Sequence, residues 1–422
     1  MEKFLIKGSS KNGVKGTIIC SGAKNAVLPL MASSILFSNT ITLTNVPLGA
    51  NDIKTMIILL KSLGSKVQVF KKKKILKITN KKKHKLLVKY KFISTMRAGV
   101  LAMGALLGKY NKCSTALSGG CSLGPRPIDY HLAGFKKLNC KYSLKNGYIN
   151  IIAKNGIKGA QYYFPKVSVT GTSNLILASV LGNGTTILKN ISIEPEVIDL
   201  IKFLKNGGAK IFSIGKRTIK IHGVKNLNGH SHEVIGDRIE AFSYLCAAAI
   251  TKGKIKVNKI EPKNLRTELK ILKNIGCNIK VHKSSIELSR KKNLQAVTIK
   301  TSPFPGFATD CMPMLMAVLT KSNGLSRIEE TIFSNRFMSA PELVRMGAKI
   351  NIKGSKAIII GKNILNAADC ISSDLRSTFA IILGAMAANG TSCINRIYHG
   401  LRGYSNLYYN LKKIGVKIKK IS

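Results

Sequence analysis

A short segment, in which a helix-like stretch passes through a tight turn into a strand, recurs six times along this 422-residue chain. The copies read LKSLGSKV, FKKLNCKY, LKNGGAKI, LKNIGCNI, LVRMGAKI and LKKIGVKI, and they are 68 to 75 residues apart. The turn residues are Gly64, Asn139, Gly208, Gly276, Gly347 and Gly415. Gly and Asn tolerate the left-handed backbone that ends many helices. A unit of about 70 residues buries little apolar surface alone, so six related units are predicted to share cores.

Five stretches rich in small apolar residues form a second recurring element, at 21–36, 169–184, 236–253, 303–324 and 373–390. They have Ser, Thr or Asp near their starts, as helix N-caps do, and run through Ala and Leu to a Gly, which predicts buried helices. Their starts carry Lys24, Asn25, Asp237, Arg238, Asp310, Asp374 and Arg376. Helix N-termini offer free N–H groups and partial positive charge to phosphates and carboxylates. Several converging starts would line a cleft for anions.

The net charge of +51 suggests nucleic-acid binding as one possible function. Most of the 69 basic residues are lysines spread along the chain, and aromatic residues do not alternate with them as base stacking requires. We therefore predict no nucleic-acid partner, with a nonenzymatic RNA-binding scaffold as the alternative. Arginines that persist among so many lysines suit planar, bidentate contacts with anions. Five of them lie near Gly, Ser or Asn: Arg97, Arg126, Arg336, Arg376 and Arg402.

Length and cysteine content set the outer limits. A chain that is 45% hydrophobic can fill two or three domains. Its nine scattered cysteines contain no C-x-x-C pair, which favours a reduced, cytoplasmic compartment. The sequence has no apolar run long enough for a membrane span and no signal-peptide pattern at its start. The histidines show no metal-ligand spacing, and His230-x-His232 is interpreted as a surface pair.

The segment GGCSLGPRPIDYH at 119–131 has the residues of a reactive loop. It places Cys121 between glycines, five residues before Arg126. A positively charged setting favours the thiolate form of a cysteine and so its reactivity. A loop over an anionic ligand is predicted.

These motifs, taken in order, resemble those of the UDP-N-acetylglucosamine 1-carboxyvinyltransferases of the EPSP synthase superfamily. The resemblance runs from Lys3 to about Ile418 through SGAKNA, TMRAG, GGCSLGPRPIDYH, KVSVTGTSN, EPEVIDLIKFL, GDRIEA, FATD, NRFM, PELVRMGA, SDLRS and RIYHGLRGY. It implies an α/β fold of two inside-out, barrel-like domains, each of three βαβαββ repeats. Domain 1 would span 24–235, and domain 2 would combine 1–23 with 236–422. The active site would lie in the cleft between them.

The resemblance also implies a reaction. The enolpyruvyl group of phosphoenolpyruvate would move to the 3'-hydroxyl of UDP-N-acetylglucosamine with release of phosphate, as the first committed step of peptidoglycan synthesis. Neither cofactor nor metal is expected, and we expect a monomer. The sister enzyme acting on shikimate 3-phosphate is the alternative, against which the cysteine loop and KVSVTGT argue.

Residue roles follow from the same resemblance. Cys121 would act as general acid toward the methylene carbon or help to release product, and Asp310 would take the proton of the sugar hydroxyl. Lys24, Arg126 and Arg402 would hold phosphoenolpyruvate, with Asn25 at the reacting centre. The implied nucleotide contacts are Arg97, Arg126, Pro127, Ile128, Asp129, Tyr130, Lys166, Val167, Ser168, Val169, Asp310 and Ile332. The implied supporting residues are Arg336, Asp374 and Arg376. Leu401, Phe242 and Ser94 depart from the family pattern.

Overall fold

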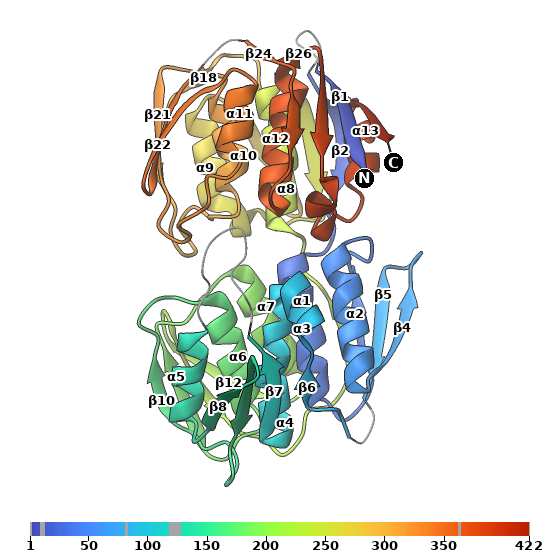
Figure 1. The fold of residues 1–422 in the computed structure, drawn as a ribbon, viewed down its shortest axis with the longest axis vertical. Helices are drawn as coiled ribbons and strands as arrows, with labels where there is room; N and C mark the ends of the chain where they lie inside the picture. The colour runs from blue at the N-terminus through green and yellow to red at the C-terminus, as the bar shows by residue number, and fades with distance from the viewer. Residues whose placement is uncertain (1, 9–12, 81–82, 118–127, 362–363, 422) are drawn as a thin grey trace. The chain divides into compact units, whose positions relative to one another are not determined.

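The computed structural model describes residues 2–8, 13–80, 83–117, 128–361 and 364–421, which form two compact units (Figure 1). The chain passes between the units at Ser21/Gly22 and again at Ile235/Gly236. We call residues 22–235 the first unit, and residues 2–21 with 236–421 the second unit. Each unit contains its own hydrophobic core.

Six four-stranded sheets share one topology. In each, a strand lies parallel to a second strand, which pairs antiparallel with a third, and the third pairs antiparallel with the edge strand. In five of these sheets the edge strand and the third strand form a hairpin, whereas in the sixth they come from opposite ends of the chain. The first unit holds β14 (Ser231–Glu233), β3 (Ile41–Thr44), β5 (Ile75–Thr79), β4 (Lys66–Phe70); β6 (Leu87–Val88), β7 (Lys112–Ala116), β9 (Tyr148–Ile152), β8 (Lys141–Lys145); and β10 (Gln161–Tyr163), β11 (Thr185–Lys189), β13 (Thr218–His222), β12 (Lys210–Gly215). The second unit holds β2 (Lys15–Ile19), β15 (Lys254–Asn258), β17 (Ser285–Ser289), β16 (Asn278–Val281); β19 (Thr298–Lys300), β21 (Leu325–Glu329), β23 (Lys356–Ile360), β22 (Lys349–Lys353); and β25 (Asp369–Ile371), β27 (Thr391–Asn395), β1 (Lys3–Lys7), β28 (Lys417–Ile421). Two short parallel pairs, also in the second unit, are β18 (Leu294–Gln295) with β20 (Ser322–Asn323) and β24 (Leu365–Asn366) with β26 (Ala388–Asn389).

Helices of two kinds accompany the sheets. Almost every side chain is buried in the central helices, which are α1 (Lys24–Ser33), α4 (Leu101–Tyr110), α6 (Val169–Ser179), α8 (Arg238–Ile250), α10 (Met312–Leu319) and α12 (Leu375–Ala387). The outer helices bury one face only, and they are α2 (Asn51–Leu63), α5 (Asp129–Lys137), α7 (Pro195–Asn206), α9 (Arg266–Asn274), α11 (Ala340–Arg345) and α13 (Leu407–Lys413). Short helices are α3 (Tyr90–Thr95) and the 3-10 turns η1 (Ser34–Leu36), η2 (Arg97–Val100), η3 (Pro262–Leu265) and η4 (Ile397–Arg402).

The six predicted turns are confirmed. Each follows an outer helix and has positive φ: 114° at Gly64, 70° at Asn139, 103° at Gly208, 103° at Gly276, 90° at Gly347 and 89° at Gly415. Each turn leads into the edge strand of a sheet. The five predicted small-residue helices are also present. The sixth central helix, α4, which continues directly from the 3-10 turn η2, was not predicted.

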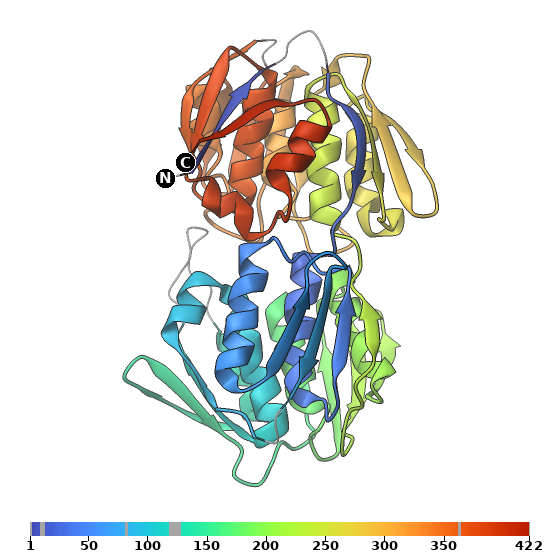
Figure 2. The ribbon, with the colours of Figure 1, turned by 90° about the vertical axis from the view of Figure 1, so that its right-hand side faces the viewer.

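The α/β fold expected from the resemblance is confirmed, with repeats of the order βαβαββ, as in β10–α6–β11–α7–β12–β13. The six sheets remain separate, and within the described residues none closes into a barrel. In the second unit the N-terminal strand β1 completes the last sheet, where Ile6 lies opposite Ile418 on one side and Ser392 on the other (Figure 2). β1 thereby takes the place that β13 holds in its own sheet.

The leading strands are exchanged where the chain changes unit. β2 pairs parallel with β15 in the second unit, although the helix that follows β2 in sequence, α1, belongs to the first. β14 pairs parallel with β3 in the first unit, and the helix that follows it, α8, belongs to the second. No helix in the described part of the chain is long and apolar enough to cross a membrane.

Candidate active site

Acidic and basic side chains at the starts of α10 and α12 meet in the second unit. Asp310 lies two residues before α10, and its carboxylate binds Arg336 Nη2 at 2.8 Å through Oδ1 and Arg376 Nη2 at 3.1 Å through Oδ2. Both guanidinium groups are buried, whereas 27% of the Asp310 side chain is exposed. Opposite charges this close stabilise the ionised carboxylate. Asp310 is therefore an anionic acceptor that a ligand can reach.

The start of α8 lies near the same cluster. Asp374 caps α12 by accepting from Arg376 N at 2.8 Å, and Asp237 caps α8 by accepting from Ile239 N at 2.9 Å. Burial lowers the pKa of Arg376, but the charges of Asp310, Tyr404 and Asp237 outweigh it and raise that pKa above its ordinary value. The three central helices of this unit thus begin close together, with Arg376 among their acidic groups.

Arg402, the last residue of η4, lies beside this cluster and is half-buried. Burial lowers the pKa of His399, and the charge of Arg402 lowers it further, while Asp374 opposes them. Tyr404, two residues after Arg402, is buried with its ring 5.5 Å from the Arg376 guanidinium carbon. Arg376 therefore links Asp310 to Asp374, and Arg402 lies near His399 in the same unit.

In the first unit, Lys24 begins α1 and its ammonium nitrogen lies 3.0 Å from Asp52 Oδ2. Only 11% of the Lys24 side chain and 5% of the Asp52 side chain are exposed. Taking an ammonium group out of water is costly unless a charged partner lies close. Asn25 follows and is half-buried. The start of α1 therefore presents a cation and an amide side by side at the positive end of the helix dipole.

His131 joins the other helix starts of the first unit. Asn174 Nδ2 donates to His131 Nδ1 at 2.8 Å and to Val100 O at 3.0 Å, and His131 Nε2 lies 3.3 Å from Thr170 Oγ1. Burial, and then the charge of Arg97, lower the pKa of His131 to about 3. The imidazole is neutral near pH 7. Its Nδ1 accepts a hydrogen bond from the NH2 group of Asn174, which can only donate, so the ring proton lies on Nε2. The buried side chains of His131 and Asn174 thus together link α5, α6 and the turn that carries Arg97.

The predicted nucleotide contacts of this unit surround His131. Arg97 is half-buried in η2, and Ser168 caps α6 by accepting from Gly171 N at 3.1 Å. The remaining contacts are Ile128 (buried), Asp129 (exposed) and Tyr130 (half-buried) at the start of α5, and Lys166 (exposed), Val167 (half-buried) and Val169 (exposed) around the start of α6. Cys121, Arg126 and Pro127 lie outside the described residues.

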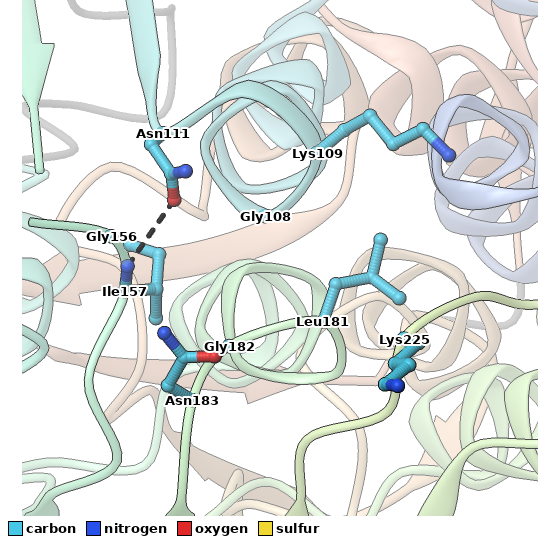
Figure 3. Close-up of a pocket in the computed structure, with 9 residues that line it drawn as sticks. All are labelled: Gly108, Lys109, Asn111, Gly156, Ile157, Leu181, Gly182, Asn183 and Lys225. Carbon is cyan, nitrogen blue, oxygen red and sulfur yellow. Dashed lines mark hydrogen bonds between the residues drawn. The ribbon is translucent and has the colours of Figure 1, made fainter.

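A polar pocket of about 250 Å³ opens at a different place in the first unit (Figure 3). Its lining includes Lys109 near the C-terminal end of α4, and Leu181 to Asn183 just after α6. Arg97 and Val169 lie at the opposite, N-terminal ends of these two helices. The pocket contains none of the predicted site residues, and we do not assign the reaction to it.

One prediction about histidine is wrong. His232 is buried rather than part of a surface pair, and its Nε2 lies 3.0 Å from Asp199 Oδ1. Asp199 belongs to α7, so the contact joins that helix to β14. In the described residues, no three His, Cys, Asp or Glu side chains are grouped so that they could hold a metal ion.

The three departures from the family pattern are accommodated without disturbing these contacts. Phe242 is fully buried and packs edge-to-face on Phe307, with ring centroids 6.1 Å apart. Leu401 packs against the core of the second unit, and Ser94 is exposed.

Three residues that position the site were not singled out from the sequence: Asp52, Asn174 and Glu330. Glu330 is buried and accepts hydrogen bonds from Thr309 and from the backbone of Ile332. Asp52 was visible only as an acidic residue in the first turn of a helix, where it suits the helix dipole. The sequence around an isolated acidic or amide residue does not show that the residue is buried or which distant residue it contacts.

Comparison with known proteins gives consistent matches over the full chain. Residues 9–411 match the family described as EPSP synthase (3-phosphoshikimate 1-carboxyvinyltransferase). A Pelagibacter ubique protein named UDP-N-acetylglucosamine 1-carboxyvinyltransferase is 47% identical over 422 residues, which cover 100% of both chains. A Campylobacter jejuni protein of the same name is 43% identical over 412 residues, or 97% of each chain.

Solved structures agree on the fold. The enolpyruvyl transferase NikO from Streptomyces tendae has a TM-score of 0.89 at 19% identity, with 99% of this chain and 98% of that chain covered. An EPSP synthase from Acinetobacter baumannii has a TM-score of 0.76 at 17% identity, with full coverage of both chains.

Proposed function

The chain belongs to the UDP-N-acetylglucosamine 1-carboxyvinyltransferases of the EPSP synthase superfamily, and from that premise we propose which of its residues carry out the reaction. It is an enzyme that transfers the enolpyruvyl group of phosphoenolpyruvate to the 3'-hydroxyl of UDP-N-acetylglucosamine and releases phosphate. This reaction commits the sugar nucleotide to peptidoglycan synthesis. The observation that carries the assignment is the 40–47% identity to relatives of that name over the whole chain.

The proposed chemistry is addition followed by elimination. In the addition, the sugar 3'-oxygen bonds to C2 of phosphoenolpyruvate while a proton is added to C3. In the elimination, a proton leaves C3 and inorganic phosphate leaves C2, which restores the C2–C3 double bond. Cys121 supplies the proton to C3 or assists product release, and Asp310 receives the hydroxyl proton. The position of Asp310 supports this role, because its carboxylate is ionised and partly exposed. Arg336 and Arg376 also reduce its affinity for a proton, so we expect transfer only as the new C–O bond forms.

The anionic groups of the substrates need fixed positive charge. We propose that Lys24, Arg126 and Arg402 hold the phosphate and carboxylate of phosphoenolpyruvate, with Asn25 at the reacting centre. The position of Lys24 and Asn25 at the start of α1, where the helix dipole favours an anion, supports this for both residues. Arg97 and the starts of α5 and α6 are proposed to bind the nucleotide, together with Ile332. The proposed substrate-binding residues are contributed by both of the expected domains, 24–235 and 1–23 with 236–422.

We also propose that the enzyme works in the cytoplasm as a monomer without a cofactor. Two phosphorylated metabolites as substrates support the compartment, and so do the eight described cysteines, all of which are free. An oligomer by light scattering would contradict the second part.

The deciding experiment is release of inorganic phosphate from phosphoenolpyruvate. We expect release that depends on UDP-N-acetylglucosamine in the wild type, and a large loss in Cys121→Ala. Turnover with shikimate 3-phosphate and none with the sugar nucleotide would favour the sister reaction. Salt-sensitive RNA binding without phosphate release would favour the basic scaffold.

A further inference from the structure

Glu330 directly follows β21 and is 3% exposed, and both of its carboxylate oxygens are engaged. Oε1 accepts from Ile332 N at 2.7 Å and from Phe333 N at 3.1 Å. Oε2 accepts from Thr309 Oγ1 at 2.9 Å. One buried side chain therefore connects two segments that are separate in sequence.

Each of these segments carries a residue of the proposed site. Thr309 precedes Asp310, and its carbonyl oxygen accepts from Arg336 Nε at 3.0 Å. The residue before the Asp310 carboxylate is thus held on its hydroxyl by Glu330 and on its carbonyl by Arg336. On the other side, the backbone of Ile332 is fixed while 38% of the residue stays exposed. Both carboxylate oxygens of Glu330 are engaged by these two segments, so the effect of Glu330 on the reaction is expected to pass through them.

We infer that Glu330 is a positioning residue that sets the placement of Asp310 and of the Ile332 segment relative to one another. This inference rests on the proposed function and adds to it a residue with a purely geometric role. Hydrogen bonds to a charged acceptor are stronger than neutral ones, so a carboxylate fixes three donors better than an amide could. In Glu330→Gln, the side-chain oxygen can still accept from the backbone of Ile332 and Phe333, but an NH2 group replaces the oxygen that accepts from Thr309.

The experiment is steady-state phosphate release by the full chain with Glu330→Ala, Glu330→Gln and Thr309→Val. For Glu330→Ala we expect the KM for UDP-N-acetylglucosamine to rise about 10- to 100-fold and kcat to fall, because charge-assisted hydrogen bonds are lost. The KM for phosphoenolpyruvate should stay within about twofold, since its proposed ligands do not touch Glu330. Glu330→Gln should recover part of the loss. Thr309→Val should lower kcat about tenfold and leave the KM for phosphoenolpyruvate within about twofold, because it frees only the Asp310 segment.

A matched control is available at the preceding residue. Glu329 forms an exposed pair with Lys300 at 3.0 Å, and Glu329→Gln should leave all three kinetic constants unchanged. Equal increases in both KM values for Glu330→Ala, or a lower melting temperature with unchanged kinetics, would assign Glu330 a structural role only and overturn the inference. If Glu330→Ala does not fold, unchanged kcat in Thr309→Val overturns it instead. An inactive wild type would refute the proposed function itself, which separates the two failures.

Discussion

His131 gives a quantitative test of the buried contacts beside the proposed nucleotide-binding residues of the first unit. Burial and the charge of Arg97 lower its pKa from 6.5 to about 3. A proton added to Nδ1 would break the 2.8 Å hydrogen bond from Asn174 and create a second positive charge near Arg97. Folding should therefore become less favourable in acid for a reason that can be assigned to one side chain.

The sign and size follow from proton linkage. The unfolded chain binds this proton more tightly than the folded protein does, so stability that is present above pH 6.5 is lost as the pH falls toward 3. Each pH unit within that window costs about 1.4 kcal/mol, so the loss between about pH 8 and about pH 5 is about 2 kcal/mol.

The assay is urea unfolding of the wild type and His131→Gln, followed by circular dichroism at both pH values. Glutamine does not titrate, so the variant reports every other acid effect, including repulsion within a chain of net charge +51. The stability advantage of the wild type should shrink by about 2 kcal/mol at the lower pH. His222→Gln, at a half-buried histidine bonded to Thr185, serves as the control. An advantage that is the same at both pH values would refute the reasoning.

Three further predictions use the same protein, the first with urea unfolding and the other two with the phosphate-release assay. Burial raises the pKa of Glu240 from 4.5 to about 7, so the stability contributed by its protonated form is lost as the pH rises through that window. The free energy of unfolding of Glu240→Gln relative to the wild type should therefore be about 3 kcal/mol higher above pH 7 than below pH 4.5, and a relative value that does not change with pH would contradict this. Asp52→Asn removes the carboxylate 3.0 Å from Lys24 and should lower kcat/KM for phosphoenolpyruvate by about tenfold or more, whereas an unchanged value would separate Asp52 from the site. Arg376→Lys loses one of the two nitrogen donors to Asp310 and should lower kcat about 10- to 100-fold. The control is Arg345→Lys, at an exposed pair with Glu342, which should not change kcat. Equal rates in both variants would argue against the Asp310 contact.

The features that could be predicted from the sequence are those that depend on a few neighbouring residues. A glycine or asparagine after a helix predicts the left-handed turn, because most other residues in that backbone conformation bring their Cβ atom too close to the neighbouring backbone. The caps at Ser168, Asp237 and Asp374 are equally local, since each side chain accepts from backbone N–H groups two or three residues ahead. Six copies of such a signal were enough to infer the repeated architecture.

The contacts that were missed join residues far apart in sequence. Asp52 lies 28 residues from Lys24, Glu330 lies 21 residues from Thr309, and His232 lies 33 residues from Asp199. Each residue alone has an ordinary local explanation, such as a helix dipole, a loop acid or a surface histidine. Burial gives these pairs their effect, and burial of a polar side chain depends on the packing of the whole unit.

The repeated and the chemical residues lie on different elements, which explains how one unit could be copied six times and still produce a site. The left-handed turns follow the outer helices, where the same backbone geometry is needed in every copy. Many of the proposed site residues lie at or near helix starts, where the first backbone N–H groups have no partner within the helix itself. Lys24 occupies one such start and Asp310 another, with opposite charges and different partners. The backbone at these positions does not require a particular residue, so the side chains can differ between copies without disturbing the turns. This variation gives the proposed site its pattern of charges.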